Sequence, residues 1–276
     1  MTKRKNITLL TTGIIASFYL QSCASSSNEQ EKLTLTGSST VAPLAGEIAK
    51  RFEAENPGVR IDVQTGGSSR GLADAREGLA DIGMVSRALK PEEEQELHGE
   101  VIARDGIGII VNSANPMENI SNEEVIAIYK GEIKNWQELK SKEAPITVVN
   151  KAEGRSTLEL FLKHFQLENK DIKADVIIGD NQQGIKTVAG NPDAVGYVSI
   201  GAAEYEIQQG VPIKLLSLDG VEASTEAVKD DTFPLSRSLT LVTKDKPQGL
   251  SQEFIDFAQS QEVHKTVEAQ NFIPQE

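Results

Sequence analysis

Strand-like and helix-like segments alternate along the chain from residue 33 onward, and this alternation restricts the possible folds more than any other feature. The stretch LTLT at 33–36 leads into a helical pattern in which Leu44, Ile48 and Phe52 recur every four residues, until NPG at 56–58 ends it. Similar strand–helix pairs follow in the rest of the chain. Such alternation is typical of α/β folds with mostly parallel sheets, so we predict that fold class.

No long Pro-rich or Ser-rich linker divides the 276-residue chain, although its length allows two lobes. If two lobes form, the chain must therefore cross between them through strands. GIGIIVN at 106–112 predicts a buried strand, and SLTLVT at 238–243 predicts a late one. KPEEEQEL at 90–97 predicts a helix whose acidic residues lie in the first turn, where the helix dipole favours them.

The first 22 residues have the layout of a secretory signal peptide: a basic start, MTKRK, precedes an apolar run that is short for a membrane-spanning helix. Cys23, the only cysteine, follows in a stretch that resembles a bacterial lipoprotein processing site. A lone cysteine is usually a buried core residue, but this one stands at the leader boundary. We predict a lipoprotein signal peptide over 1–22, lipidation and membrane anchoring at Cys23, and a flexible tether over 23–32.

The chain carries a formal net charge of −13 and becomes more acidic once the basic leader is removed. Binding to nucleic acid depends on cations that neutralise phosphates, so we expect no nucleic-acid partner. His98, His164 and His264 are scattered without metal-ligand spacing, so we expect no metal site and no cofactor. An anion site in such a chain must rely on local donors rather than on long-range attraction.

A cluster of small hydroxyl residues separates the first predicted strand from the first predicted helix: Gly37 is followed by Ser38, Ser39 and Thr40. Ligands of parallel α/β sheets bind beyond the carboxyl ends of the strands, where helix N-termini offer unpaired N–H groups and partial positive charge. The turn therefore has the composition of an anion site. Taken alone, it is more simply explained by Ser39 or Thr40 capping the helix.

The same composition recurs at two further strand-to-helix junctions, GGSSRG at 66–71 and EGRST at 153–157. Each junction also carries an arginine, whose fork matches oxyanion geometry, and a lysine, which acts as a point charge, lies near the second. The candidate anion-binding residues from these segments are Ser68, Ser69, Arg70, Lys151, Arg155, Ser156 and Thr157. Three such turns favour one shared anion site over three separate helix caps.

Six motifs, taken in order along the chain, resemble those of a known family. They are GSSTVAPL, TGGSSRG, ADIGMVSR, GRST, AVGYVSIG and FPLSRSL, and they are similar to motifs of the phosphate-binding proteins of bacterial phosphate ABC transporters, which are type II periplasmic binding proteins. The resemblance covers roughly residues 33–274. It implies an extracytoplasmic receptor that is not an enzyme, captures inorganic phosphate and delivers it to the membrane permease of an ABC transporter; we also expect a monomer.

The resemblance implies a two-lobed periplasmic-binding-protein fold in which each lobe is a mostly parallel sheet flanked by helices and two hinge crossovers join the lobes. The first lobe would comprise residues 33–111 and 236–276, and the second residues 112–235. Phosphate would lie in the cleft between them.

The resemblance also implies the phosphate contacts, which are Ser39, the backbone of Thr40, Ser68, the position of Ser86 and the GRST loop at 154–157. Two positions depart from the usual pattern. Lys151 stands where the family commonly has an arginine, and Arg155 stands where it often has a serine. Which cation meets the ligand is therefore open.

A third departure concerns the group that accepts the proton of phosphate. Some family members have an aspartate where this chain has Ser86, so the acceptor carboxylate must come from elsewhere or be missing. Asp105, directly before the predicted strand at 106–112, is our candidate, and the alternative is an ordinary turn residue before Gly106.

Two other functions remain open from the sequence. One is a receptor for another oxyanion such as sulfate, molybdate or tungstate. The other is a secreted phosphatase, which would need an activated nucleophile beside a base, and no histidine lies near a Ser/Thr turn in the sequence.

Overall fold

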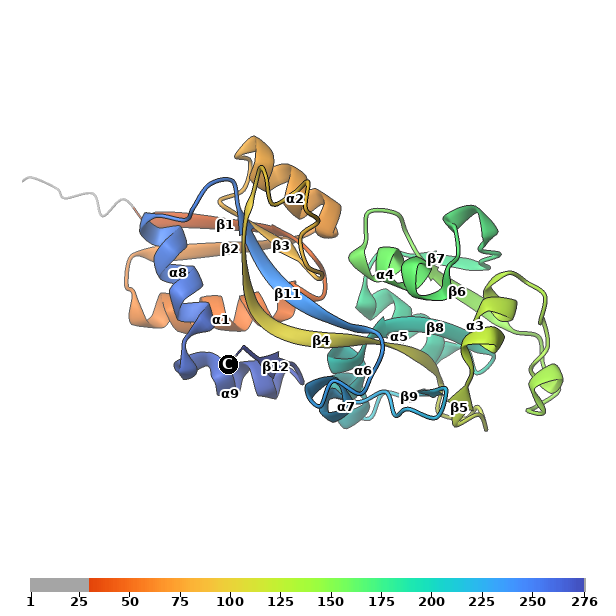
Figure 1. Cartoon of the computed structure of the whole chain (residues 1–276). Coiled ribbons are helices and arrows are strands. Elements are labelled where there is room, and N and C mark those ends of the chain that lie inside the picture. The colour runs from red at the N-terminus through yellow and green to blue at the C-terminus, as the bar shows by residue number, and fades with distance from the viewer. Residues whose placement is uncertain (1–29, 276) are drawn as a thin grey trace, which may run out of the picture.

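The computed structural model describes residues 30–275 and has two lobes joined by strands (Figure 1). The predicted leader, Cys23 and most of the predicted tether lie outside the described residues. Within residues 30–275, no helix has the length and apolar character needed to cross a membrane.

Three parallel strands form the centre of the first lobe: β2 (Val59–Thr65), β1 (Glu31–Gly37) and β3 (Ile82–Val85) pair side by side in that order. Five helices belong to this lobe: α1 (Val41–Glu55), α2 (Ser68–Glu77), α8 (Gly249–Gln259), α9 (His264–Ala269) and the short 3₁₀ helix η3 (Gln261–Val263). Leu44, Ile48 and Phe52 of α1 are buried, as their spacing predicts.

The second lobe also has three parallel strands, with β6 (Thr147–Lys151) between β7 (Val176–Ile178) and β8 (Ala194–Ser199). Its helices are α3 (Asn122–Tyr129), α4 (Ser156–Phe165), α5 (Asn181–Gly190), α6 (Ile200–Gln208), α7 (Thr225–Lys229), η1 (Trp136–Leu139) and η2 (Asn169–Asp171). Its remaining strands are β5 (Asn119–Ile120), β9 (Ile213–Leu215) and β10 (Ser217–Leu218).

Two long antiparallel strands join the lobes, β4 (His98–Asn112) and β11 (Ser236–Thr243), and Figure 1 shows β4 running from one lobe into the other. β4 pairs with β11 and with β12 (Ile273–Pro274) up to Gly106, and pairs with β8 from Ile107 onward. Because β4 changes its pairing partners along its length, the chain passes from the first lobe to the second within one continuous strand and without a linker. The strand predicted at 106–112 is therefore the second half of a longer hinge strand.

The helix predicted over 90–97 is wrong, because residues 91–96 form consecutive turns. Two carboxylate contacts explain the difference. Glu93 accepts from the backbone N–H of Lys90 at 2.8 Å and from the guanidinium of Arg87 at 2.7 and 2.8 Å. These contacts hold Glu93 toward the folded body, whereas Glu92, Glu94 and Glu96 stay exposed.

The main apolar cores of the two lobes are separate clusters, and each lobe has a second, smaller cluster. Leu35, Ile48 and Phe254 belong to the core of the first lobe, whereas Trp136 and Phe161 belong to that of the second. Separate cores allow each lobe to keep its structure while the angle between the lobes changes. Polar groups, rather than apolar ones, occupy much of the region where the lobes meet.

Candidate functional site

The three predicted Gly/Ser/Thr turns lie where the two lobes face each other, at the N-termini of α1, α2 and α4. The backbone N–H of Ser69 donates across the cleft to the carbonyl of Gly154 at 3.2 Å. A fourth N-terminus, that of α5, joins them, because the amide of Asn181 donates to the hydroxyl of Thr40 at 3.0 Å. Four helix N-termini from two lobes thus direct partial positive charge toward the cleft.

Gly67 lies where the backbones of the two lobes approach closely. Its φ of +95° lies in the region that favours glycine, and a Cβ there would lie 2.7 Å from the carbonyl oxygen of Gly154 and 2.8 Å from the Cδ of Arg155. Any larger residue at Gly67 would push the two lobes apart. The glycine of the TGGSSRG motif therefore serves the contact between the lobes.

Arg237 of β11 provides the central cation of the cleft, and its side chain is 1% exposed. The guanidinium donates to the hydroxyl of Thr157 at 2.9 Å, to that of Thr40 at 3.3 Å and to that of Ser86 at 3.5 Å. Thr40 and Ser86 come from the first lobe and Thr157 from the second. One cation therefore gathers hydroxyls from both lobes.

Asp105 holds that cation in place. The residue lies directly opposite Arg237 in the β4–β11 register, and its Oδ2 accepts from Nη2 at 2.7 Å and from Nε at 3.0 Å. Its Oδ1 accepts from the backbone N–H of Gly201 at 3.2 Å. The side chain is 1% exposed, so this is a buried, hydrogen-bonded ion pair.

The hydroxyls around Arg237 are oriented by it. An arginine has donors only, so Thr40 and Thr157 accept from the guanidinium with their oxygens. Each hydroxyl keeps its own proton to donate elsewhere. The cluster therefore presents donors, which suits an anion with several oxygens.

Lys151 is the second buried cation of the cleft. Its ammonium donates to the side-chain oxygen of Asn181 at 2.7 Å, and the residue is 3% exposed. Burial, together with the nearby positive charge of Arg237, lowers the pKa of Lys151 to about 7. The Asn181 side chain thus connects Lys151 with Thr40, because its oxygen accepts from Lys151 and its nitrogen donates to Thr40.

The hydroxyls of Ser38 and Ser68 accept hydrogen bonds from the backbone of the first lobe. The Ser38 oxygen accepts from the backbone N–H groups of Thr40 and Val41 at 3.1 and 3.4 Å, so it is a helix cap, as the simpler interpretation of the turn allowed, although it is Ser38 and not Ser39 or Thr40 that caps. The oxygen of Ser68 accepts from the backbone N–H of Ser86 at 3.3 Å. Both side chains are buried at the cleft end of the first lobe.

Two buried polar atoms at the start of α4 have no hydrogen-bond partner among the described residues: Nε of Arg155 and the hydroxyl of Ser156. Buried donors without partners are uncommon in folded proteins, although Thr36, Asn115, Ser141 and Asn271 also have such atoms. The GRST loop therefore keeps two donors available beside Thr157.

Two candidates lie differently from the sequence prediction. Arg70 is directed away from the cleft, because its guanidinium binds Asp74 at 3.0 Å and the carbonyl of Thr65 at 3.2 Å on the exposed face of α2, so we withdraw it as an anion contact. The side chain of Ser69 is exposed, and only its backbone joins the lobes.

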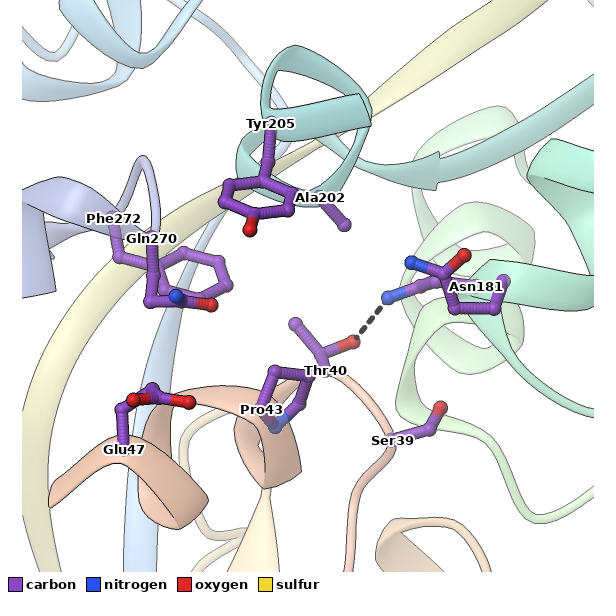
Figure 2. A pocket seen from close by; sticks show the side chains of 10 residues that line it. Ser39, Thr40, Pro43, Glu47, Asn181, Ala202, Tyr205, Gln270 and Phe272 are labelled. Atoms are coloured by element: carbon purple, nitrogen blue, oxygen red, sulfur yellow. Dashed lines mark hydrogen bonds between the residues drawn. The ribbon is translucent and has the colours of Figure 1, made fainter. Parts of the chain in front are cut away.

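Ser39 lines a cavity of about 260 Å³ beside the cleft (Figure 2). Figure 2 shows the Asn181–Thr40 hydrogen bond at the wall of this cavity, with Tyr205 and Phe272 on the opposite side. Thr40 belongs both to this cavity wall and to the buried cluster of Arg237.

A second inter-lobe contact lies at the rim of the cleft. Glu159 of α4 accepts from Arg87 and from Lys90 of the first lobe, each at 2.7 Å. Arg87 is also bound by Glu93. Burial raises the pKa of Glu159, but the hydrogen bonds from Lys90 and Arg87 outweigh it and lower that pKa below its ordinary value.

The sequence interpretation missed Arg237 and Asn181. Arg237 lies inside the FPLSRSL motif, and an arginine among hydroxyls at the start of a predicted strand was an available signal. Asn181 opens the helix NQQGIKTVAG directly after a strand, which is the same strand-to-helix position as the three predicted turns. Gly179 stands at this junction, but no Ser or Thr accompanies it.

The chain is similar to known phosphate-binding proteins. A family model described as a PBP superfamily domain matches residues 23–262. The phosphate-binding protein PstS of Bacillus subtilis is 32% identical over 248 residues, which cover 88% of this chain and 80% of that protein. PstS of Borreliella burgdorferi is 27% identical over 269 residues, which cover 94% of this chain and 95% of that protein.

Solved structures of phosphate receptors are also similar to this chain. A crystal structure from Clostridium perfringens, described as a phosphate ABC transporter substrate-binding protein with bound phosphate, matches with a TM-score of 0.83 and 32% identity over 89% of this chain and 100% of that chain. An ABC-type phosphate transport receptor from Vibrio cholerae matches with a TM-score of 0.72 and 28% identity over 88% of this chain and 100% of that chain.

Proposed function

The chain belongs to the PBP superfamily, among its PstS-type phosphate-binding proteins, and we propose that it captures inorganic phosphate between its lobes and delivers it to the permease of an ABC transporter. Like its relatives, it is a binding protein and not an enzyme. The delivery step and the permease partner are our inference from the names of these relatives.

One observation carries the binding role: Arg237 gathers the hydroxyls of Thr40, Ser86 and Thr157 from both lobes in a buried cluster. A tetrahedral oxyanion needs several donors on different sides. We infer that phosphate binds beside this cluster and takes donors from the three hydroxyls and Lys151. The unpaired donors of Arg155 and Ser156 support the same position.

We assign Asp105 a positioning role in place of the proton-accepting role expected from the sequence. Arg237 and the N–H of Gly201 already engage both of its carboxylate oxygens. A carboxylate committed in this way fixes the guanidinium and balances its charge. Asp105→Asn is therefore expected to weaken phosphate binding by displacing Arg237, without admitting sulfate.

We further propose that Cys23 is lipidated and anchors the receptor on the extracytoplasmic side of a membrane. The support is the order of basic, apolar and small residues before Cys23. Cys23→Ala should abolish the lipid mass and move the protein from the membrane fraction to the aqueous one. An unchanged fraction and mass would contradict the anchor.

Calorimetric titration tests the binding role directly. Phosphate, arsenate, sulfate and molybdate are titrated separately into the purified receptor, and a phosphate-ester cleavage assay is run beside them. We expect tight binding of phosphate, weaker binding of sulfate and molybdate, and no ester cleavage. Equal binding of all four anions would replace the phosphate receptor by a general oxyanion receptor, and cleavage would make it a phosphatase.

A further inference from the structure

Lys151 differs from Arg237 in having no carboxylate partner. Within residues 30–275, no Asp or Glu oxygen lies within ion-pair distance of its ammonium, and its hydrogen bond goes to the neutral Asn181 at 2.7 Å. Arg237, in contrast, is balanced by Asp105 at 2.7 Å. A buried charge with no opposite charge beside it is costly, and a lysine can avoid that cost by releasing its proton.

The charged groups around Lys151 mostly add to this cost. Arg237 of β11 and Arg155 at the start of α4 are both positive and disfavour a second cation, whereas Asp180, at the start of α5, favours it more weakly than Arg237 disfavours it. On the side of β8, the Tyr197 hydroxyl accepts from the backbone N–H of Lys151 at 3.4 Å. Burial raises the pKa of Tyr197, so it stays neutral and adds no charge.

Together these surroundings bring the pKa of Lys151 to about 7, with burial as the main cause. An anion bound beside the Arg237 cluster would add the negative charge that Lys151 lacks. Because an opposite charge within a few ångströms favours the charged form, the pKa of the amine must then rise.

We propose that anion binding in the cleft is coupled to protonation of Lys151, so that the receptor takes up a proton together with phosphate. The proton moves from solvent to the lone pair of the Lys151 nitrogen, and the ammonium formed donates to the anion while Asn181 keeps it oriented. Arg237 cannot take this role, because a guanidinium is always charged and Asp105 already balances it. The proposal rests on the proposed function, since it concerns the same site.

The sign of the effect follows from proton linkage. Below pH 7 the amine already carries its proton, so binding needs no uptake. Above pH 7 the free receptor has lost the proton and the complex holds it, so affinity falls with pH, by up to about tenfold per pH unit. The receptor would therefore hold phosphate more tightly in neutral or mildly acidic surroundings than in alkaline ones.

Calorimetry in buffers of different ionisation enthalpy measures the protons taken up at about pH 8.5. The wild-type receptor is compared with Lys151→Arg, which keeps a cation that does not titrate, and with Lys151→Met, which has none. The protonation of bound phosphate depends on the charge beside it, so it is measured in each complex from the ³¹P chemical shift and subtracted. We expect the wild type to take up close to one proton more than either variant, and this excess to vanish at about pH 6.

An NMR titration of the Lys151 side chain gives a second measurement that does not depend on the variants binding phosphate. Its resonance is identified by its loss in Lys151→Arg. We expect the pKa of the amine to lie near 7 without phosphate and to rise by at least one unit with saturating phosphate.

Equal proton uptake by wild type and variants, or a pKa that phosphate does not move, would overturn the coupling while leaving the phosphate receptor intact. Absence of phosphate binding by the wild type at both pH values would instead overturn the proposed function. The two failures are therefore distinguishable in one set of titrations.

Discussion

Two of the contacts between the lobes differ in physical character. At the hinge end, Arg237 joins Thr40 and Thr157 in a cluster that excludes solvent, whereas at the rim Glu159 joins Arg87 and Lys90 with its side chain 43% exposed. The buried contact involves desolvated groups and is strongly sensitive to the loss of one partner. The rim contact is screened by water and salt. The cleft thus combines a specific buried site with a weaker, adjustable closure.

Removing Arg237 from the buried contact should have the largest effect on folding stability and on phosphate binding. Arg237→Met leaves Asp105 as a buried charge without its partner, which typically costs about 3–5 kcal/mol of folding free energy. Phosphate binding should also be lost. Urea denaturation and calorimetric titration measure the two effects.

The double variant Asp105→Asn with Arg237→Met is the control. It removes both charges, so it should recover much of the lost stability while still failing to bind phosphate. If the double variant is as unstable as Arg237→Met, the unpaired charge is not the cause.

Gly67→Ala tests whether the lobes must approach as closely as the structure has them. The new Cβ would lie 2.7 Å from the Gly154 carbonyl oxygen, and overpacking of this kind costs about 1–3 kcal/mol. Phosphate affinity should fall on the order of tenfold or more, with a larger radius of gyration in small-angle scattering.

Gly78→Ala is the matched control, because Gly78 also has a positive φ, +69°, but nothing lies within 4 Å of its added Cβ. Its ψ of 24° places it in the αL region, which alanine adopts at lower cost than the conformation of Gly67, whose ψ is 160°, so Gly78→Ala should leave affinity and scattering unchanged. Equal losses from both variants would show that strain in α2, and not the contact between the lobes, is responsible.

Glu159→Gln should have a smaller effect that depends on salt. Removing the charge weakens the contacts with Arg87 and Lys90, so we expect a loss of about 0.5–1 kcal/mol in closure, seen as a few-fold lower affinity at low salt. High salt should reduce the difference. Glu132→Gln, which breaks the Lys130–Glu132 pair within one lobe, is the control.

The rim contact also has a defined pH window. The pKa of Glu159 is lowered in the folded protein, so its contribution is present above the ordinary value of 4.5 and is lost as pH falls through the lowered pKa. Wild type and Glu159→Gln should therefore converge in affinity in acid. If the two proteins still differ in phosphate affinity in acid, the charge of Glu159 is not the cause of the difference.

Arg70→Ala should have the smallest effect. Arg70 binds Asp74 on the exposed face of α2, and surface substitutions of this kind usually change stability by less than about 0.5 kcal/mol. Phosphate affinity should be unchanged. A tenfold loss would return Arg70 to the candidate site.

The sequence predicted the positions that depend on local pattern. Thr40 and Ser86 follow the neighbouring parallel strands β1 and β3, whose ends converge on one edge of the first lobe, and Thr157 follows β6 of the second lobe, which faces that edge. Spacing alone does not tell on which side of α2 a side chain leaves, and the structure directs Arg70 toward Asp74. The helix at 90–97 was mispredicted because Glu93 forms a tertiary contact with Arg87.

Composition and periodicity by themselves determined the α/β class, the strand-to-helix turns and the preference for a local anion site, because these depend on residues close together in the chain. Only the tertiary structure decided which cation is central. Arg237 meets Asp105 across 132 positions through the register of β4 and β11, and Lys151 meets Asn181 across 30. Charge balance and burial arise from such distant pairings, so the cation paired with a carboxylate and the one bonded to a neutral amide could not be told apart until the lobes were placed together.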